Sequence, residues 1–269
     1  MRFAFLLSCV LYAATADAVA GGQNPSPPVQ PSSTPDFLFG RPNGSVGIRA
    51  GWLFARAGSE WYDFVTRPDQ LTIDRSDFNA PGIAGDVGLA ISSRLDVVID
   101  IEFNRRSIDS EYRQLVDNNR QPITQTTALS QVNMMGGLKF ALTERGREIS
   151  QLAWIPHKVV PYVGAGGGVL WYKLQQTGDF VDVLDPRTGA AQDCRVAACS
   201  IFSDVFQSTG WTPAAQLFGG VEIKLTRRLY ATFDARYLWA AAKMGRQFVS
   251  FDKLDLAGLR TSAGVNVLF

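Results

Sequence analysis

Apolar and polar residues alternate with a two-residue period through eight successive segments of this chain. In the clearest segment, LDVVIDIEFN, one face carries Leu95, Val97, Ile99, Ile101 and Phe103, and polar residues dominate the other face. Because successive side chains of a β-strand point to opposite faces, this period predicts strands. The fifth segment is so rich in glycine that the pattern does not assign its faces. The eight segments span residues 45–56, 82–91, 95–104, 128–142, 159–174, 211–225, 229–240 and 256–269.

The lengths of the segments and of their connections favour a membrane barrel. An ordinary strand has about 5–6 residues, whereas about ten tilted residues cross the hydrocarbon core of a bilayer, and these segments are that long or longer. Short turns alternate with long loops, as in outer-membrane barrels. Since a sheet in lipid leaves no edge open, we predict an all-β fold: an eight-stranded antiparallel up-and-down transmembrane β-barrel over residues 44–269.

Two connections have features of their own. Residues 143–158 are long for a turn on the short side, and we expect a short interfacial helix there, with Leu152, Trp154 and Ile155 facing lipid. Residues 105–127 form the second long loop. In the third long loop, the sequence DPRTG is a turn signal between apolar residues. It predicts a hairpin that continues the fifth and sixth strands beyond the membrane.

The N-terminal part of the chain differs from the rest. Arg2, the apolar run FAFLLSCVLYAATA and the small residues of Ala18-Val19-Ala20 predict a secretory signal peptide over residues 1–20. Lipidation at Cys9 is a minor alternative, because the apolar run ahead of that residue is short. Residues 21–43 are rich in Pro, Ser, Gly and Asn and are interpreted as an extended linker. Export together with a barrel predicts localisation in a bacterial outer membrane.

Charge and cysteine content narrow the possible partners. The 26 basic and 25 acidic residues nearly cancel, so nothing favours binding to nucleic acid. Cys194 and Cys199 remain after export, and an oxidising compartment favours a disulfide between them. A zinc site is disfavoured because the only histidine, His157, lies far away in sequence. No motif indicates a metal or another cofactor.

In a membrane barrel the apolar face of each strand points to lipid and the polar face points into the lumen. We expect the outward aromatic residues to form two belts at the membrane–water boundaries. The predicted belt residues are Trp52, Phe54, Phe103, Phe140, Tyr162, Trp171, Trp211, Tyr230, Tyr237 and Trp239, with Trp154 near one belt. The predicted inward charges are Arg49, Asp86, Asp96, Asp100, Glu102, Lys139, Glu222, Lys224, Asp234, Arg236 and Arg260. Since side chains just fill an eight-stranded barrel, these charges are expected to form ion pairs that plug the lumen.

The chain resembles the small eight-stranded outer-membrane barrels of the OmpA/OmpX type. The resemblance covers about residues 44–269, through PYVGAGGGVLWY, GVNVLF and the pattern of eight segments. In that family the barrel-assembly machinery reads the C-terminal aromatic strand, which the resemblance implies for Phe269, Val267 and Val265. We expect one departure from the OmpA type, namely that the chain ends with the barrel and carries no peptidoglycan-binding domain.

Several classes of function follow from this architecture. We predict a structural or surface-interaction role in outer-membrane lipid, with a narrow channel for small solutes or ions as the alternative. A loop-mediated adhesin or receptor is the second alternative, with an unknown extracellular ligand bound by loops 57–80 and 175–210. In the first of these loops Trp61, Tyr62 and Phe64 either face a partner or pack loop against loop.

An enzyme is the competing class. Barrels that hydrolyse esters generally pair a serine with a histidine, and His157 lies in a turn on the wrong side of the membrane. An acidic site in the first loop is conceivable, but acidic surface loops are ordinary. The acidic residues are Glu60, Asp63, Asp69, Asp74 and Asp77. We therefore predict no catalytic residue.

Overall fold

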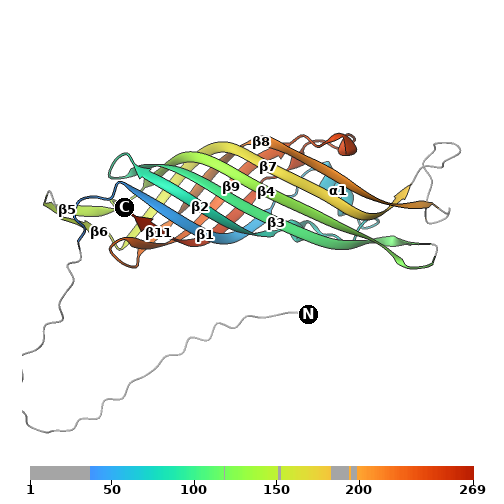
Figure 1. Ribbon diagram of the computed structural model, residues 1–269, viewed down its shortest axis with the longest axis horizontal. Coiled ribbons are helices and arrows are strands. Elements are labelled where there is room, and N and C mark those ends of the chain that lie inside the picture. The colour runs from blue at the N-terminus through green and yellow to red at the C-terminus, as the bar shows by residue number, and fades with distance from the viewer. Residues whose placement is uncertain (1–36, 118, 151–152, 183–193, 195–198) are drawn as a thin grey trace, which may run out of the picture. The chain divides into compact units, whose positions relative to one another are not determined.

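The computed structural model describes residues 37–117, 119–150, 153–182, 194 and 199–269. Eight strands pair antiparallel with their neighbours in a ring, and β11 pairs with β1 so that the ring closes (Figure 1). The predicted all-β fold, an eight-stranded up-and-down barrel, is confirmed. The predicted signal peptide and residues 21–36 of the predicted linker lie outside the described residues. The ring consists of β1 (Gly44–Ala55), β2 (Ala80–Ala90), β3 (Leu95–Val116), β4 (Pro122–Ala141), β7 (Val159–Asp182), β8 (Ser200–Lys224), β9 (Leu229–Ala242) and β11 (Gly258–Leu268).

The strands are staggered around the ring. A path along paired residues starts at Ser45 of β1 and returns to β1 at Ala55, ten residues further along the same strand. The path runs through Gly88, Val98, Gly137, Gly166, Gln216, Leu238 and Gly258. Stagger and strand number together determine the tilt of the strands and the width of a barrel. With eight strands, the interior is just wide enough for side chains to fill.

Two long hairpins project beyond the rest of the barrel, at the right of Figure 1. The β3–β4 hairpin has strands of 22 and 20 residues, and the β7–β8 hairpin has strands of 24 and 25 residues. The predicted continuation of the fifth and sixth strands is thus confirmed, with pairing out to Asp182 and Ser200. The interpretation of residues 105–127 as a loop was wrong, because this stretch is largely strand. The predicted turn sequence DPRTG, at residues 185–189, lies outside the described residues.

The exterior of β3 shows where the membrane boundary lies. Its outward residues are apolar up to Phe103, which is 42% exposed. The next outward residues, Arg105, Ser107 and Asp109, are polar and exposed. About ten strand residues cross a bilayer, so this change of polarity marks the end of the lipid-facing part. Beyond it both faces carry polar residues, which removes the alternation although the backbone ladder continues.

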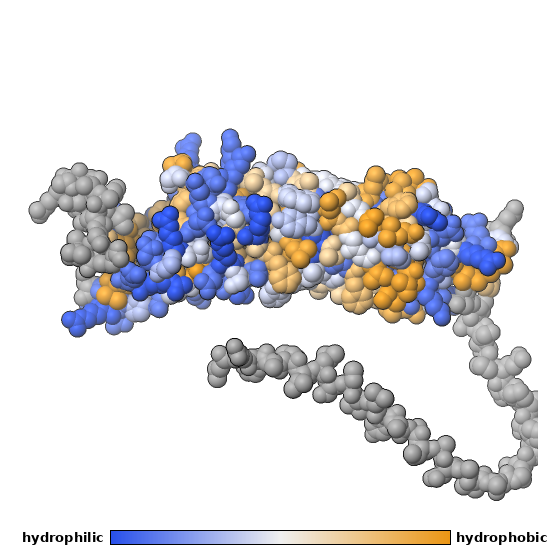
Figure 2. All heavy atoms as spheres, turned by 180° about the vertical axis from the view of Figure 1, so that it is seen from behind, coloured by the Kyte–Doolittle hydropathy of each residue, from blue (hydrophilic) through white to orange (hydrophobic). Residues whose placement is uncertain are grey.

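The same change of polarity extends around the barrel. Figure 2 shows hydrophobic side chains gathered over the half away from the hairpins, whereas hydrophilic side chains cover the half that the hairpins form. Exposed apolar residues of the first half come from every strand of the ring. They include Ile48, Ile83, Ile99, Leu138, Val163, Leu217, Phe233 and Val265. Since such a surface is unfavourable in water and matches lipid, the barrel spans a membrane.

The connection between β4 and β7 differs from the expected helix. It contains a small hairpin of β5 (Gly146–Ser150) and β6 (Ala153–Pro156). Trp154 was expected to face lipid, but it is only 4% exposed, and its backbone pairs with that of Leu38. The end of the predicted linker therefore contacts β6. The expectation for Leu152 lies outside the described residues.

The loops at the hairpin end fold together over the barrel mouth. They contain α1 (Glu60–Val65), the 3-10 helices η1 (Arg75–Phe78) and η2 (Arg246–Phe248), and the two-residue strand β10 (Leu254–Asp255). Cys194 and Cys199 form a disulfide, as predicted.

Within the described part of the chain, no helix is both long enough and apolar enough to cross a membrane.

Candidate functional site in the barrel lumen

The inward faces of the strands fill the lumen with charged and polar side chains. Glu102 is slightly exposed, at 13% for its side chain, and Lys224 is partly buried at the end of β8. The other predicted inward charges are buried: Arg49, Asp86, Asp96, Asp100, Lys139, Glu222, Asp234, Arg236 and Arg260. Buried charges need partners, and the geometry of their contacts shows which partners they have.

Arg236 is the centre of these contacts. Its Nη1 donates to Asp100 Oδ1 at 2.8 Å, and its Nε donates to Asp234 Oδ1 at 3.0 Å. The guanidinium also lies over the ring of Phe218, 4.9 Å from the ring centroid. In the ring of strands β3 and β9 are opposite each other, so the contact between Arg236 and Asp100 crosses the lumen.

Asp234 also accepts hydrogen bonds from two other side chains. Its Oδ1 accepts from Ser262 Oγ at 2.8 Å, and its Oδ2 accepts from Tyr162 Oη at 3.3 Å. Arg49 lies beside it, with Nη1 at 3.8 Å from Asp234 Oδ2 and 3.0 Å from Asp86 Oδ1. A carboxylate held by several donors at once is fixed in position, which makes the centre of the lumen a rigid network.

A second group of charges lies nearer the start of β1 and the C-terminal residue Phe269. Lys139 Nζ donates to Glu222 Oε1 at 2.7 Å and lies 3.7 Å from Asp96 Oδ2. Asp96 also forms an ion pair with Arg145, from the segment after β4. Lys139 lies over the ring of Tyr162, 5.1 Å from its centroid. One cation thus joins carboxylates from β3 and β8.

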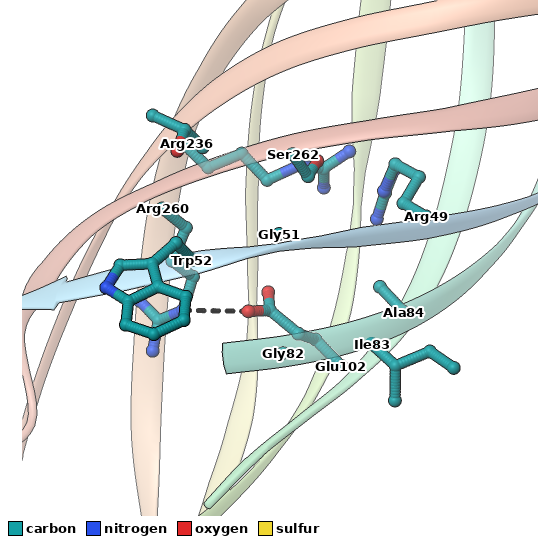
Figure 3. A pocket seen from close by; sticks show the side chains of 11 residues that line it. Arg49, Gly51, Trp52, Gly82, Ile83, Ala84, Glu102, Arg236, Arg260 and Ser262 are labelled. Carbon is teal, nitrogen blue, oxygen red and sulfur yellow. Dashed lines mark ion pairs between the residues drawn. The ribbon is translucent and has the colours of Figure 1, made fainter. Parts of the chain in front are cut away.

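A third group lies toward the hairpin end. Arg260 on β11 places Nε 3.3 Å from Glu102 Oε1 and donates from Nη2 to Gln131 Oε1 at 3.1 Å. Figure 3 shows the pair of Arg260 and Glu102 beside Gly51 and Gly82. Since β11 and β4 are opposite each other in the ring, Arg260 is a second link across the lumen.

Glycines of the wall make room for these side chains. A Cβ on Gly47 would lie 1.7 Å from Asn266 Oδ1, and a Cβ on Gly82 would lie 2.0 Å from Asn104 Nδ2. Both asparagines are buried in the lumen. The network therefore needs the absence of side chains at these two positions of β1 and β2.

Little space is left within the network. One cavity between Arg49, Glu102 and Arg260 and another between Asp86, Lys139 and Asp234 each measure about 10 Å³. A volume of this size holds about one water molecule. Several buried atoms, such as Arg49 Nε and Asn133 Oδ1, have no hydrogen-bond partner among the described residues. We expect ordered water at these atoms.

An apolar core lies on the hairpin side of the charged network. Barrel residues such as Leu129, Leu170 and Leu238 meet loop residues such as Trp61 and Leu254, and all five are at most 5% exposed. The rings of Trp61, Tyr62 and Phe78 contact one another edge to face. The loop aromatics Trp61 and Tyr62 therefore pack loop against loop inside the mouth.

Asp255 holds the first and last of these loops together. Its Oδ2 accepts from Arg56 Nε at 2.7 Å and from Gly58 N at 2.8 Å, and its Oδ1 accepts from Ala257 N at 3.1 Å. Ser59 Oγ accepts from the backbone nitrogen of Asp255 at 3.2 Å. The hydrogen bond and charge of Asp255 raise the pKa of Arg56. The cap is thus tied down by a buried carboxylate.

Three acidic residues of the first loop, Asp63, Asp74 and Asp77, have partners in the structure. Asp63 is paired with Arg75, and Asp74 lies 3.8 Å from Arg113. Asp77 Oδ2 accepts from the backbone nitrogen of Asp74 at 2.8 Å. The partners of these carboxylates lie in the loop and on β3. Among the described residues, no group of three or more His, Cys, Asp or Glu has the geometry to hold a metal ion.

Two residues of the predicted aromatic belts are corrected by the structure. Tyr162 is 5% exposed and Tyr230 is 3% exposed, and both point into the barrel. Their hydroxyls donate to Asp234 and to the carbonyl of His157, so each ring is held inside by its polar end. The others lie on the outward face: Trp52, Phe54, Phe103, Phe140, Trp171, Trp211, Tyr237 and Trp239.

The sequence pattern missed two parts of the site. Arg145 lies four residues beyond Ala141, the last residue of β4, so no strand alternation assigned it to the lumen. The apolar core of the mouth was missed because its loop residues follow no period. A signal for the core was present in the aromatic run of the first loop, EWYDF.

A closed eight-stranded barrel with an apolar exterior and a filled polar lumen defines a small transmembrane β-barrel of the outer-membrane type. The sequence matches no protein-family model and none of the characterised proteins with which it was compared. The chain is similar to several solved structures, and at 11–12% sequence identity this similarity concerns the fold alone.

Three of these structures illustrate the similarity. Neisserial surface protein A is 12% identical, with 84% of this chain and 96% of that chain covered and a TM-score of 0.41. Ail, the attachment invasion locus protein of Yersinia pestis, is 12% identical, with 85% and 99% covered and a TM-score of 0.42. The outer membrane protein OprG from Pseudomonas aeruginosa is 11% identical, with 86% and 99% covered and a TM-score of 0.41.

Proposed function

We propose that this protein is a closed barrel of the bacterial outer membrane with a structural or surface-interaction role. The observation that supports the proposal most directly is the pair of contacts that cross the lumen, from Arg236 to Asp100 and from Arg260 to Gln131. Side chains that join opposite walls leave no open path between them. The apolar core at the mouth is a second obstacle to ions and water.

The two long hairpins support the surface-interaction part of the proposal. On β3 the outward residues just beyond Phe103, namely Arg105, Ser107 and Asp109, are polar, so this part of the barrel stands in water outside the membrane. Paired strands present a rigid surface, and rigid elements position binding residues better than loops do. An extracellular ligand of loops 57–80 or of the β7–β8 hairpin is therefore part of the proposal.

Outer-membrane lipid and the barrel-assembly machinery are the other proposed partners. Val265, Val267 and Phe269 form an outward apolar row, with exposures of 37%, 43% and 57%. Such a row is available to lipid in the inserted barrel and to an assembly factor before insertion. The proposal includes no catalytic activity.

Single-channel recording in planar bilayers tests whether the barrel is closed. We expect no steady conductance from the refolded wild-type protein. The control is a variant with Arg236→Ala, Arg260→Ala and Trp61→Ala, which removes both links across the lumen and part of the mouth core; we expect it to show openings. Steady conductance of the wild-type protein would instead establish the narrow-channel alternative.

A further inference from the structure

Two basic residues lie just beyond the aromatic belt at the hairpin end of the barrel. On the outward face of β3, Arg105 is the next residue after Phe103, and on the outward face of β7, Lys173 is the next residue after Trp171. Arg105 is exposed and Lys173 is half-buried. Since outward aromatic residues mark the boundary between hydrocarbon and water, both cations are at the level expected for lipid headgroups.

The pairing of neighbouring strands brings these cations into one row with two hydroxyl groups. Arg105 pairs with Ser130 of β4, and Ser130 pairs with Lys173. Lys173 in turn pairs with Thr209 of β8, and the four strands lie side by side in the wall (Figure 1). Neighbouring strands are about 4.8 Å apart, so the backbones of Arg105 and Lys173 are about 10 Å apart. We call these four residues the rim row.

The outward rows on either side of the rim row contain no carboxylate. The row toward the membrane consists of Phe103, Val132, Trp171 and Trp211. The row away from the membrane consists of Ser107, Ala128, Gln175 and Gln207. The next outward residue of β3 is Asp109, whose Oδ1 accepts from Thr126 Oγ1 at 2.8 Å. Within the described part of the chain, neither Arg105 nor Lys173 has an ion-pair partner, so this charge is available to an anion from outside the protein.

A phosphate group has the chemistry that matches the rim row. The guanidinium of Arg105 offers a planar fork of donors that fits phosphate oxygens, and Lys173 adds a second positive charge. The hydroxyl of Ser130 lies between them and is a further donor. The adjacent apolar row, in which Trp211 is 59% exposed, offers a surface for hydrocarbon. A molecule that uses both rows carries phosphate at one end and acyl chains at the other.

We propose that the rim row binds a lipid with a phosphorylated headgroup, in the membrane leaflet on the hairpin side. The phosphate lies between Arg105 and Lys173, and the acyl chains lie along the row that contains Trp171 and Trp211. A soluble phosphate compound would use the charges alone, without the apolar row. The inference rests on the proposed contact with outer-membrane lipid and names the class of that lipid. It does not depend on whether the lumen conducts, so this test and the conductance test fail separately.

Photochemical labelling in vesicles tests the proposal and locates the lipid. The protein is reconstituted in phosphatidylcholine with a small fraction of photoreactive phosphatidic acid or of phosphatidylcholine with the same photoreactive acyl chain. Mass spectrometry then identifies the labelled peptides. We expect phosphatidic acid to label the peptides of Val132, Trp171 and Trp211 roughly 20-fold more than phosphatidylcholine does, because each basic residue near a membrane surface contributes about fivefold in affinity. Equal labelling by the two lipids would overturn the proposal.

A soluble competitor distinguishes a lipid from a free phosphate. Glycerol 3-phosphate carries the same phosphate group without acyl chains, and in excess it should leave most of the labelling in place. If it abolishes the labelling by phosphatidic acid, the rim row binds soluble phosphate and the assignment to a lipid is wrong.

Three variants assign the labelling to the rim row. Arg105→Gln and Lys173→Gln each remove one charge, and each should lower the labelling by phosphatidic acid about fivefold. Arg120→Gln is the matched control, because Arg120 lies in the turn that joins β3 and β4 at the far end of the same hairpin. It should leave the labelling unchanged. Labelling by phosphatidylcholine reports whether each variant is inserted. Equal losses in the three variants would show that overall charge attracts the lipid, which contradicts the proposal.

Discussion

Arg236 on β9 and Asp100 on β3 join opposite walls of the barrel through a hydrogen bond of 2.8 Å. Asp234 holds the other edge of the same guanidinium, so two buried carboxylates share one cation. A buried ion pair does not guarantee a gain in stability over an apolar core, but breaking one leaves a charge without its partner. The resulting loss of stability of the barrel can be measured.

Arg236→Ala should lower the free energy of unfolding by about 3–5 kcal/mol, because Asp100 and Asp234 lose their main cation. Urea unfolding of the protein in lipid vesicles measures this change. The control is Arg75→Ala, which breaks an ion pair with Asp63 whose side chains are both 53% exposed. Exposed pairs contribute at most about 1 kcal/mol. Equal effects of the two substitutions would contradict the assignment of Arg236 to a buried network.

Gly47→Ala should destabilise the barrel by about 1–3 kcal/mol, because the added methyl group collides with Asn266 in a filled lumen. Gly136→Ala is the matched control, since nothing lies within 4 Å of a Cβ at that position. Truncation of the partner, in the double variant Gly47→Ala with Asn266→Ala, should restore part of the loss. The same urea titration tests all three proteins, and a loss that persists unchanged in the double variant would refute the collision.

Arginine substitutions on the exterior of β3 test the membrane boundary. Ile99→Arg places a charge in the middle of the apolar stretch and should cost about 2–4 kcal/mol. Ser107→Arg, two outward positions beyond Phe103, should change stability by less than about 1 kcal/mol. Both side chains are exposed on the same strand and face, so depth is the main difference between the two sites. A similar cost at both sites would show that the boundary is misplaced.

The mouth core should weaken at high pH. Burial raises the pKa of Tyr62 above its usual value of about 10, and the charge of Asp255 acts in the same direction. The folded loop thus retains a neutral phenol that the unfolded loop ionises, so its stability is full below about pH 10 and falls as the pH rises further. Hydrogen exchange of residues 57–79 at about pH 9 and pH 11, corrected for the intrinsic rate, measures the change.

Tyr62→Phe provides the comparison for this pH dependence. The variant lacks the ionisable hydroxyl, so exchange in the same loop should lose most of its pH dependence beyond the intrinsic rate. Tyr237→Phe, on the exterior of β9, should behave like the wild-type protein. If the loop of Tyr62→Phe opens at high pH as the wild-type loop does, another group is responsible.

Strand alternation predicted the barrel and most inward charges because lipid and lumen impose opposite polarities on neighbouring residues. Leu95 to Phe103 on the outside and Asp96 and Asp100 on the inside follow that rule directly. The prediction failed for Tyr162 in the strand rich in glycine, where no apolar row defines a face. Tyr230 was misassigned because an aromatic ring with a hydroxyl suits both a belt and a polar lumen.

The hairpins and the mouth core were not predictable from alternation for a different reason. The outward face of β3 beyond the membrane is in water and carries polar residues. The sequence pattern of Arg105, Ser107 and Asp109 is therefore the same as that of a polar loop. Trp61 and Leu254 meet only because loops that are distant in sequence fold over the same opening. Contacts of this kind depend on the whole ring of strands and not on any local pattern.

The junction between β1 and β11 pairs Ser45 with Leu268, residues from nearly opposite ends of the folded chain. Contacts this distant in sequence are slow to form, because the intervening chain must first be ordered. Until the two strands meet, each exposes a row of unpaired amide groups that hydrocarbon cannot satisfy. A polypeptide cut before the last strand should therefore fail to insert at all, rather than insert with a gap in its wall.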